Sequence, residues 1–153
     1  MDISSQPLQF SLRPATRAEA VTIRKIISDA NINPLGLNWQ RFILAVDQAG
    51  KIIGCGQIKP HTDGTYELAS IAVLPEWRGR GVARSIILYL LEQHPGRLYL
   101  TCRAPLEPLY QKFGFKTIEE SEMTPYFRRI SRLVRIFNRI IRLPDRLLVM
   151  RRD

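Results

Sequence analysis

A run of glycines lies between an apolar, strand-like segment and an amphipathic segment, and this spacing could bind a phosphate group. The run is Arg78-Gly79-Arg80-Gly81, and it precedes Val82, from which apolar residues recur every three or four positions. Glycine lets the backbone approach a ligand closely, and the first turn of a helix has N–H groups without an intrahelical acceptor. The helix dipole adds positive potential there. We therefore expect a nest of backbone amides suited to a pyrophosphate.

Two common phosphate-binding patterns do not fit this run. A P-loop needs Gly-Lys followed by Ser or Thr, which the chain lacks. The dinucleotide fingerprint Gly-x-Gly-x-x-Gly begins with Gly79 and Gly81, but Arg84 stands where its third glycine would be. The glycine run could therefore form a different kind of pyrophosphate site, or it could be a plain turn with two solvated arginines.

The segments around the run predict one mixed α/β sheet. Alternating or apolar stretches predict strands, and apolar residues at a 3.6-residue period predict helices, the first of them starting at a capping box of Thr16 and Glu19. A chain of 153 residues is near the size of a single domain, so residues 1–153 are expected to form one. The expected strands are 8–13, 41–47, 51–59, 66–74, 97–102, 115–118 and 147–150, and the expected helices are 16–30, 81–94 and 106–113.

The glycine run also carries an Arg/Gln-x-x-Gly-x-Gly/Ala signature, with Arg78, Gly81 and Ala83 at its fixed positions. Two further segments agree in order. Glu67–Pro75 is similar to the strand that precedes this signature, and Leu109–Phe115 contains a Tyr-x-x-x-Gly-Phe pattern. Through these segments the chain resembles the GNAT superfamily of N-acetyltransferases. The resemblance implies a mixed, mostly antiparallel sheet flanked by helices, with acetyl-CoA as co-substrate and no metal.

The resemblance also implies roles for individual residues. Backbone amides of the glycine run would bind the pyrophosphate, and the edge of the preceding strand would pair with the pantetheine arm and polarise the thioester carbonyl. Tyr110 would protonate the departing CoA thiolate. The residues implied to bind the cofactor are Ile71, Ala72, Val73, Arg78, Gly79, Arg80, Gly81, Val82, Ala83 and Arg84.

A general base is needed because an amine such as that of lysine, with a pKa of ~10, is protonated at neutral pH. Glu67 is the candidate, acting through water, since several members of the superfamily hold a glutamate at this point; an exposed edge carboxylate is the alternative. Leu100–Cys102 offers no carboxylate where the ribosomal-protein acetyltransferases place their base, and Ala104–Leu106 replaces the usual asparagine. The acceptor is therefore left open among protein N-termini, lysines, polyamines and small-molecule amines.

The remaining reactive side chains predict structural roles. Cys55 and Cys102 have no paired framework and are expected to be small buried residues rather than nucleophiles. His61 and His94 lack metal-ligand spacing; His94 is expected at a helix end, while His61 lies on a loop from which it could touch substrate. The first residues carry an early acid, and no apolar run is long enough to span a membrane, so a cytoplasmic location is expected.

The net charge of +9 is concentrated near the end of the chain. Residues 125–153 hold nine Arg and two Asp, giving +7, while the other residues hold 14 Lys/Arg and 12 Asp/Glu, giving +2. Between 126 and 142 apolar residues fall at helical spacing with arginines between them, where the superfamily usually has only a loop. This basic helical insertion before the last strand could cover the substrate groove, form a homodimer, or bind an acidic partner or an anionic membrane surface through Arg128–Arg142. Few aromatic residues accompany the arginines, which disfavours nucleic acid. A module that binds CoA or a partner without catalysis is the rival to an enzyme.

Overall fold

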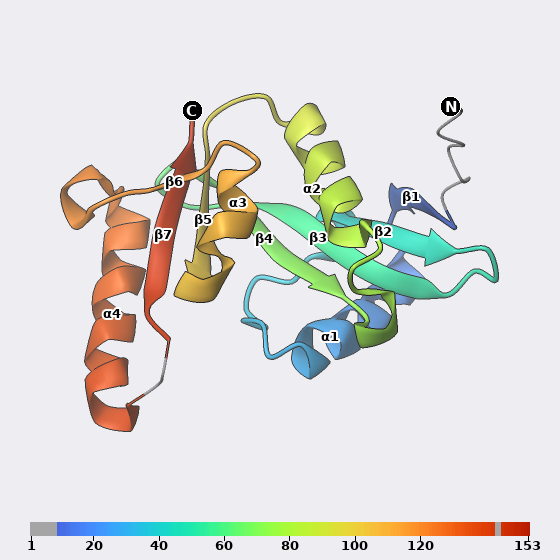
Figure 1. Cartoon of the computed structure of the whole chain (residues 1–153), viewed down its shortest axis with the longest axis horizontal. Coiled ribbons are helices and arrows are strands. Elements are labelled where there is room, and N and C mark those ends of the chain that lie inside the picture. The colour runs from blue at the N-terminus through green and yellow to red at the C-terminus, as the bar shows by residue number, and fades with distance from the viewer. Residues whose placement is uncertain (1–8, 143–144) are drawn as a thin grey trace, which may run out of the picture. The chain divides into compact units, whose positions relative to one another are not determined.

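The computed structural model describes residues 9–142 and 145–153 (Figure 1). The chain forms two compact units: unit 1 comprises Met1–Gln57 and Ser70–Gln93, and unit 2 comprises Ile58–Ala69 and His94–Asp153. That residues 1–153 act as one domain stays a prediction.

The helices and strands, in chain order, are β1 (Phe10–Pro14), α1 (Ala20–Asp29), β2 (Phe42–Asp47), β3 (Ile52–Pro60), β4 (Tyr66–Val73), α2 (Val82–Gln93), β5 (Leu98–Arg103), α3 (Glu107–Gln111), β6 (Lys116–Thr117), α4 (Pro125–Ile141) and β7 (Leu147–Arg152). Short 3₁₀ turns lie at Arg17–Glu19, Trp39–Arg41, Pro75–Trp77, Ala104–Leu106 and Glu120–Glu122.

The strands pair in the order β1-β2-β3-β4-β5-β7-β6. The pairs β1–β2, β2–β3, β5–β7 and β7–β6 are antiparallel, and β4 pairs in parallel with β5 at Glu67 opposite Tyr99. The predicted mixed, mostly antiparallel sheet is therefore confirmed, as is a helix within the basic insertion before the last strand. Across residues 9–142 and 145–153, no helix is both long and apolar enough to cross a membrane.

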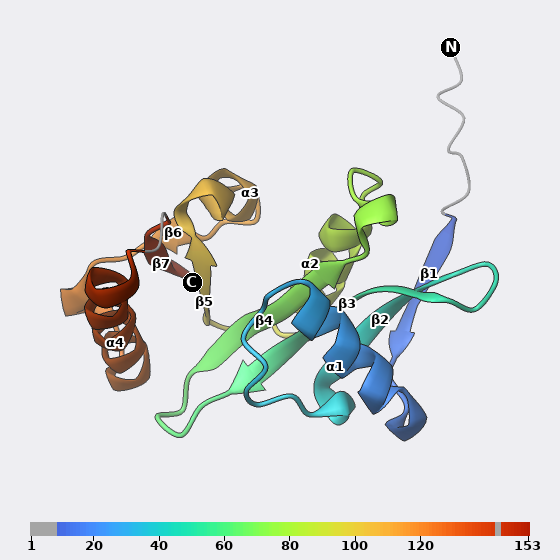
Figure 2. The ribbon, with the colours of Figure 1, turned by 90° about the horizontal axis from the view of Figure 1, so that it is seen from below.

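Unit 1 places α1 and α2 on opposite faces of its strands (Figure 2). Successive side chains of a strand point to opposite faces. One face of β2, with Phe42, Leu44 and Val46, packs in a single cluster with Ile23 and Ile27 of α1. The capping box predicted at Thr16 is present, although a 3₁₀ turn separates it from α1. The first predicted strand is confirmed from Phe10, while Leu8 lies outside the described residues.

Two glycines of β3 let α2 lie close to the sheet. A Cβ added at Gly56 would be 2.6 Å from Ile71 Cδ1 and 2.7 Å from Ile86 Cγ2, and one added at Gly54 would be 3.0 Å from Val82 Cγ1. Since Val82 begins α2, this close packing fixes where the N-terminal end of that helix lies relative to β3 and β4.

Unit 2 has α3 and α4 on opposite sides of β5 and β7 (Figure 2). The first turns of α4 are anchored by Phe127, which is fully buried and stacks on Tyr99 of β5 with ring centroids 4.8 Å apart. Met123 and Val149 complete this cluster with Ile118. The strand predicted at 115–118 is shorter than expected, at Lys116–Thr117, because the chain turns after it into the segment that leads to α4.

Candidate functional site

The predicted pyrophosphate nest is a turn in unit 1 between β4 and α2. Gly79 and Gly81 have φ angles of 75° and 81°, in the left-handed region that favours glycine. A Cβ added at either position would meet nothing within 4 Å. Glycine is therefore required at these two positions by the backbone conformation and not by close neighbours, and the space beside the turn is open for a ligand.

Side chains and backbone contacts hold the turn in place. The Nε of Arg78 donates to the carbonyl of Val73 at 3.4 Å, and the guanidinium of Arg80 lies 5.0 Å from the ring centroid of Trp77. Both the amide and the hydroxyl of Ser85 donate to the carbonyl of Gly81, at 3.0 and 2.9 Å, which starts the hydrogen bonding of α2. The first-turn amides of such a helix can bind an anion.

Ser70 distorts β4 immediately before the predicted pantetheine edge Ile71–Val73. Its φ of 59° is rare for a residue other than glycine. The side-chain amide of Gln57 donates to Ser70 Oγ at 2.9 Å, and the Cys55 thiol donates to the Ser70 carbonyl at 3.6 Å. Sequence reasoning missed Ser70, because serine carries no signal for a left-handed conformation and its partners come from another strand.

Replacing Ser70 with Ala should lower the free energy of unfolding by about 1–3 kcal/mol. The change leaves the buried Gln57 amide without its acceptor, and burying an unpaired polar group carries this penalty. Denaturant unfolding measures the loss. Ser85→Ala is the matched control, since it removes a hydroxyl from a more exposed hydrogen bond. Equal stability of the Ser70→Ala variant and the wild type would contradict the proposed role of this hydrogen bond.

Unit 2 gathers Glu67, His61 and Thr101 in a buried cluster. Glu67 Oε2 lies 2.7 Å from His61 Nε2, and the Thr101 hydroxyl donates to Glu67 Oε1 at 3.4 Å. The side chains of His61 and Glu67 are only 7% and 10% exposed. The alternative of an exposed edge carboxylate is therefore wrong. Glu67 instead lies among polar partners that can orient it.

The first turn of α4 covers this cluster. The Tyr126 ring stacks on His61 with centroids 3.6 Å apart, and Phe127 meets the same imidazole edge-on at 5.6 Å. Burial raises the pKa of Tyr126, and the carboxylates of Glu67 and Asp63 raise it further. The amide of Tyr126 donates to Asp63 Oδ2 at 3.1 Å. The basic insertion thus contributes to the surroundings of the candidate base, although the sequence did not identify Tyr126 and Phe127 as the residues that make these contacts.

We expect acid to weaken the contact between Asp63 and the start of α4. Burial opposes its ionisation, but hydrogen bonds from Thr65 and from the Tyr126 amide outweigh burial and lower its pKa from 3.8 to about 2. A depressed pKa contributes stability that is present above the unfolded pKa and lost as pH falls through the folded one. We therefore expect Asp63→Asn to lower the Tm at neutral pH, with the difference from the wild type shrinking between pH 3.8 and about 2. A difference that stays constant over that pH range would contradict this.

Tyr110 lies on α3, in the same unit as Glu67. Its ring meets Phe115 edge-on at 6.3 Å. Burial raises the pKa of Tyr110 to about 12, with a smaller contribution from Cys102. Glu67 contacts Thr101 and Tyr110 is near Cys102, and these neighbours on β5 point to opposite faces. The candidate base and the candidate acid therefore approach β5 from opposite sides.

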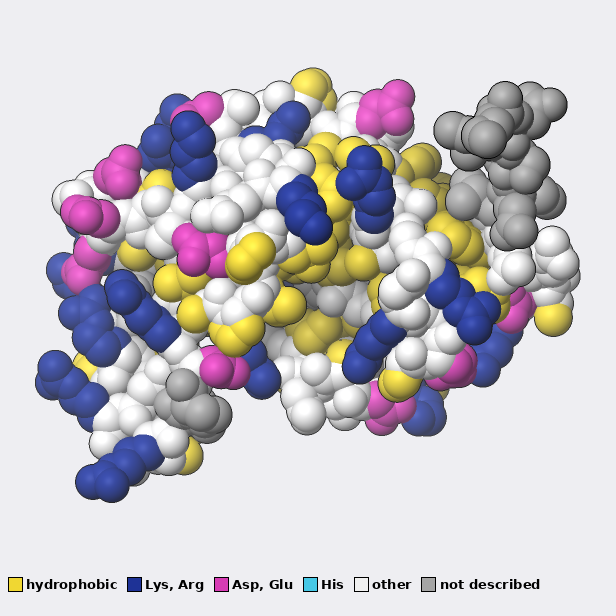
Figure 3. All heavy atoms as spheres, viewed as in Figure 1, with side chains coloured by type: hydrophobic (Ala, Val, Ile, Leu, Met, Phe, Trp, Pro, Cys, Tyr) yellow, Lys and Arg dark blue, Asp and Glu magenta, His cyan; other side chains and the backbone are white. Residues whose placement is uncertain are grey.

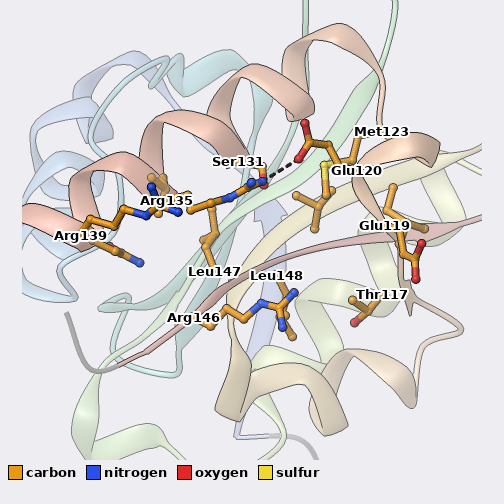
Figure 4. A pocket seen from close by; sticks show the side chains of 14 residues that line it. Thr117, Glu119, Glu120, Met123, Ser131, Arg135, Arg139, Arg146, Leu147 and Leu148 are labelled. Atoms are coloured by element: carbon orange, nitrogen blue, oxygen red, sulfur yellow. Dashed lines mark hydrogen bonds and ion pairs between the residues drawn. The ribbon is translucent and has the colours of Figure 1, made fainter. Parts of the chain in front are cut away.

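A separate groove of about 750 Å³ opens in unit 2 between α4 and β7 (Figure 4). Arg135, Arg139 and Arg146 line it beside apolar residues such as Leu148. The Nη2 of Arg135 donates to Glu120 Oε2 at 2.6 Å, so part of this charge is already neutralised. None of the residues predicted to bind the cofactor or to act in catalysis lines this groove.

Among residues 9–142 and 145–153, no group of three or more His, Cys, Asp or Glu side chains is placed to hold a metal ion. His94 follows α2, as expected, and its ring is tilted over Tyr66 with centroids 4.6 Å apart. Cys55 and Cys102 are both buried and free. The predicted structural roles of both cysteines agree with this burial.

One protein-family pattern and two relatives match the sequence of this chain. The sequence pattern of the acetyltransferase (GNAT) domain matches residues 38–117. The cysteine-rich protein 2-binding proteins of Homo sapiens and Mus musculus are 37% and 36% identical over 89 residues. These alignments cover 54% of this chain but 11% of either relative, so the chain corresponds to about a tenth of their length.

Solved structures share the fold. An N-acetylglutamate synthase from Neisseria gonorrhoeae, solved with coenzyme A and N-acetyl-glutamate, has a TM-score of 0.72 and 18% identity, covering 94% of this chain and 34% of that one. A Mycobacterium tuberculosis protein solved with CoA has a TM-score of 0.70 and 21% identity, covering 93% and 98%. A GNAT acetyltransferase from Staphylococcus aureus has a TM-score of 0.68 and 14% identity, covering 94% and 98%. The family pattern spans more than half of the chain, and this chain therefore belongs to the GNAT acetyltransferase family.

Proposed function

We propose that the protein is an acetyl-CoA-dependent N-acetyltransferase that moves the acetyl group to a primary amine by direct attack in a ternary complex. The turn before α2 carries the proposal, because two left-handed glycines there open directly onto a helix N-terminus. Structures of the same fold that contain coenzyme A support the choice of donor. The pyrophosphate would be bound by amides from Gly79 to Arg84, and the pantetheine arm would pair with Ile71–Val73.

On the acceptor side, Glu67 takes the amine proton through a water molecule. The neutral amine nitrogen attacks the thioester carbonyl carbon, a C–N bond forms, and the C–S bond breaks to release the CoA thiolate. The nitrogen then gives its second proton to solvent. His61 and Thr101 orient the Glu67 carboxyl group through the contacts described above. Tyr126 and Phe127 limit solvent around His61 by stacking on its ring. In this mechanism the start of α4 contributes by shielding His61 from solvent.

On the donor side, Tyr110 offers its hydroxyl to the leaving sulfur. Its raised pKa of about 12 keeps the phenol protonated at neutral pH. Because a thiol has a pKa of about 8.5, a full proton transfer from this phenol is uphill. The hydrogen bond would therefore stabilise the developing thiolate in the transition state, and the released CoA would take its final proton from solvent.

The state of the two cysteines supports direct transfer over an acetyl-enzyme. Burial raises the pKa of Cys55 to about 12 and that of Cys102 to about 11. A thiol acts as a nucleophile in its thiolate form, so both side chains are unreactive at neutral pH. Neither cysteine is therefore suited to form an acetyl-cysteine intermediate between donor and acceptor.

The alternative is a non-catalytic module that binds CoA or docks on a partner through its basic helix. The exposed arginines and apolar residues of α4 favour that reading. Acetyl-CoA incubated with a panel of amines separates the two: peptides with free N-termini, peptides with an internal lysine, polyamines and small-molecule amines. An enzyme releases one free thiol for each acetylated amine, as measured by a thiol reagent and mass spectrometry. Absence of thiol release with every class of amine would favour the module.

A further inference from the structure

Helix α4 exposes a long apolar face that unit 2 does not cover. Its side chains range from 52% to 76% exposed, in contrast to the buried Phe127 near the start of the same helix. At about 100° per residue these side chains share one arc of roughly 140°. Contiguous exposed apolar surface of this kind marks an interaction site. The residues of this face, called the apolar face below, are Leu133, Ile136, Phe137, Ile140 and Ile141.

Arg132, Arg135 and Arg139 lie along one flank of the apolar face, Arg129 lies within its arc, and the residues that pack on the protein lie along the other flank. Phe127 is buried against β5, and Val134 and Asn138 line the groove between α4 and β7. Arg135 and Arg139 lie at the other edge of the same groove, on the far flank of the apolar face with Arg132. Residues 125–142 contain six arginines and no acidic residue. Figure 3 shows dark blue side chains along the side of the molecule that α4 forms. The helix is therefore divided into a packed, an apolar and a cationic sector.

Only some of these arginines form ion pairs within the protein. Glu120 pairs with both Arg132 and Arg135, at 2.5 and 2.6 Å. In residues 9–142 and 145–153, the guanidinium groups of Arg129, Arg139 and Arg142 have no acidic partner. Their charge remains available to an anionic surface.

We propose that α4 docks the protein on an anionic lipid membrane, with the apolar face at the level of the acyl-chain boundary and the arginines among the headgroups. A helix of 17 residues is about 25 Å long and lies along such a surface. A lipid surface supplies the apolar contact and the negative charge together. A second copy of this chain would cover the apolar face, but its α4 has no acid to pair with the arginines. Binding of nucleic acid would leave the large apolar side chains without a role.

Vesicle flotation tests this docking without reference to acetyl transfer. We expect the protein to float with vesicles of phosphatidylcholine and phosphatidylglycerol in a three-to-one ratio, and to stay unbound with phosphatidylcholine alone. Added salt should weaken the binding, since the surface charge is screened. The double variant Phe137→Ser, Ile140→Ser should bind at least about tenfold more weakly, because each large apolar side chain contributes by burial.

Matched variants separate docking from a general loss of structure. Val21→Ser with Leu88→Ser removes two apolar side chains, 75% and 45% exposed, from other helices and should leave binding unchanged. Arg129→Gln with Arg139→Gln should weaken binding to the anionic vesicles, while Arg17→Gln with Arg24→Gln should not. All these positions are exposed, so circular dichroism should show equal folding.

Three outcomes would overturn the proposal. Equal binding to neutral and anionic vesicles, or no binding to either, removes the anionic membrane as the partner. A dimer in sedimentation equilibrium that the Phe137→Ser, Ile140→Ser variant abolishes, without vesicle binding by the wild type, assigns the apolar face to a second copy. Retention of duplex DNA that depends on Arg129 and Arg139 but not on Phe137, again without vesicle binding, assigns the arginines to nucleic acid.

Discussion

Tyr110→Phe should lower kcat about 100-fold or more while leaving the KM for acetyl-CoA within a few-fold of the wild type. The change removes one hydroxyl that donates a hydrogen bond to charge developing on sulfur, and loss of such a donor has an effect of this size. The phenyl ring retains the edge contact with Phe115, so folding should be unaffected. Initial rates of thiol release at saturating acetyl-CoA and amine measure the effect.

Tyr66→Phe serves as the control, because Tyr66 is 42% exposed and has no role in the proposed mechanism. With a pKa of about 12, Tyr110 should also leave kcat flat with respect to its own ionisation up to about pH 10. Unchanged turnover of the Tyr110→Phe variant at saturating substrates would remove this residue from the mechanism.

Glu67→Gln should lower kcat/KM for the amine about 100-fold at neutral pH, the size of effect typical of a lost general base. The difference from the wild type should narrow as pH rises toward 10, because an amine of pKa ~10 then loses its proton to solvent without assistance. The glutamine keeps the size of the side chain and a polar contact with His61. Rate profiles from neutral pH to about pH 10 with one lysine-type acceptor measure both effects.

The matched control is Glu76→Gln, which removes an exposed carboxylate paired with Lys51 in unit 1 and should leave the rate unchanged. A purely structural role for Glu67 would lower the rate by the same factor at every pH, or lower only the Tm. Either result would contradict its assignment as the base.

Local features of this fold were predictable from the sequence because their signals are local. The β2–β3 hairpin follows from two apolar runs around Gln48-Ala49-Gly50, and Gly50 indeed has a φ of 85°. The turn before α2 follows from its glycines, since left-handed conformations select glycine. The basic helix also followed from the 3.6-residue period of its apolar residues.

Features that depend on contacts between distant segments were not predictable. The sequence is compatible with Glu67 as an exposed acid or as a buried base, and only its contacts with His61 and Thr101 distinguish the two. In the same way, the period of α4 does not say which apolar residues are buried. Phe127 is buried because it stacks on Tyr99, whereas Phe137 is exposed because it lies on the apolar face of α4.

The direct passage of the acetyl group from CoA to an amine is tested best by initial rates measured while both substrates are varied. The proposed ternary complex predicts double-reciprocal lines that intersect, together with no acetyl mass on the protein after incubation with acetyl-CoA alone. Parallel lines, with an acetyl group found on a protein side chain, would indicate an acetyl-enzyme and contradict the mechanism.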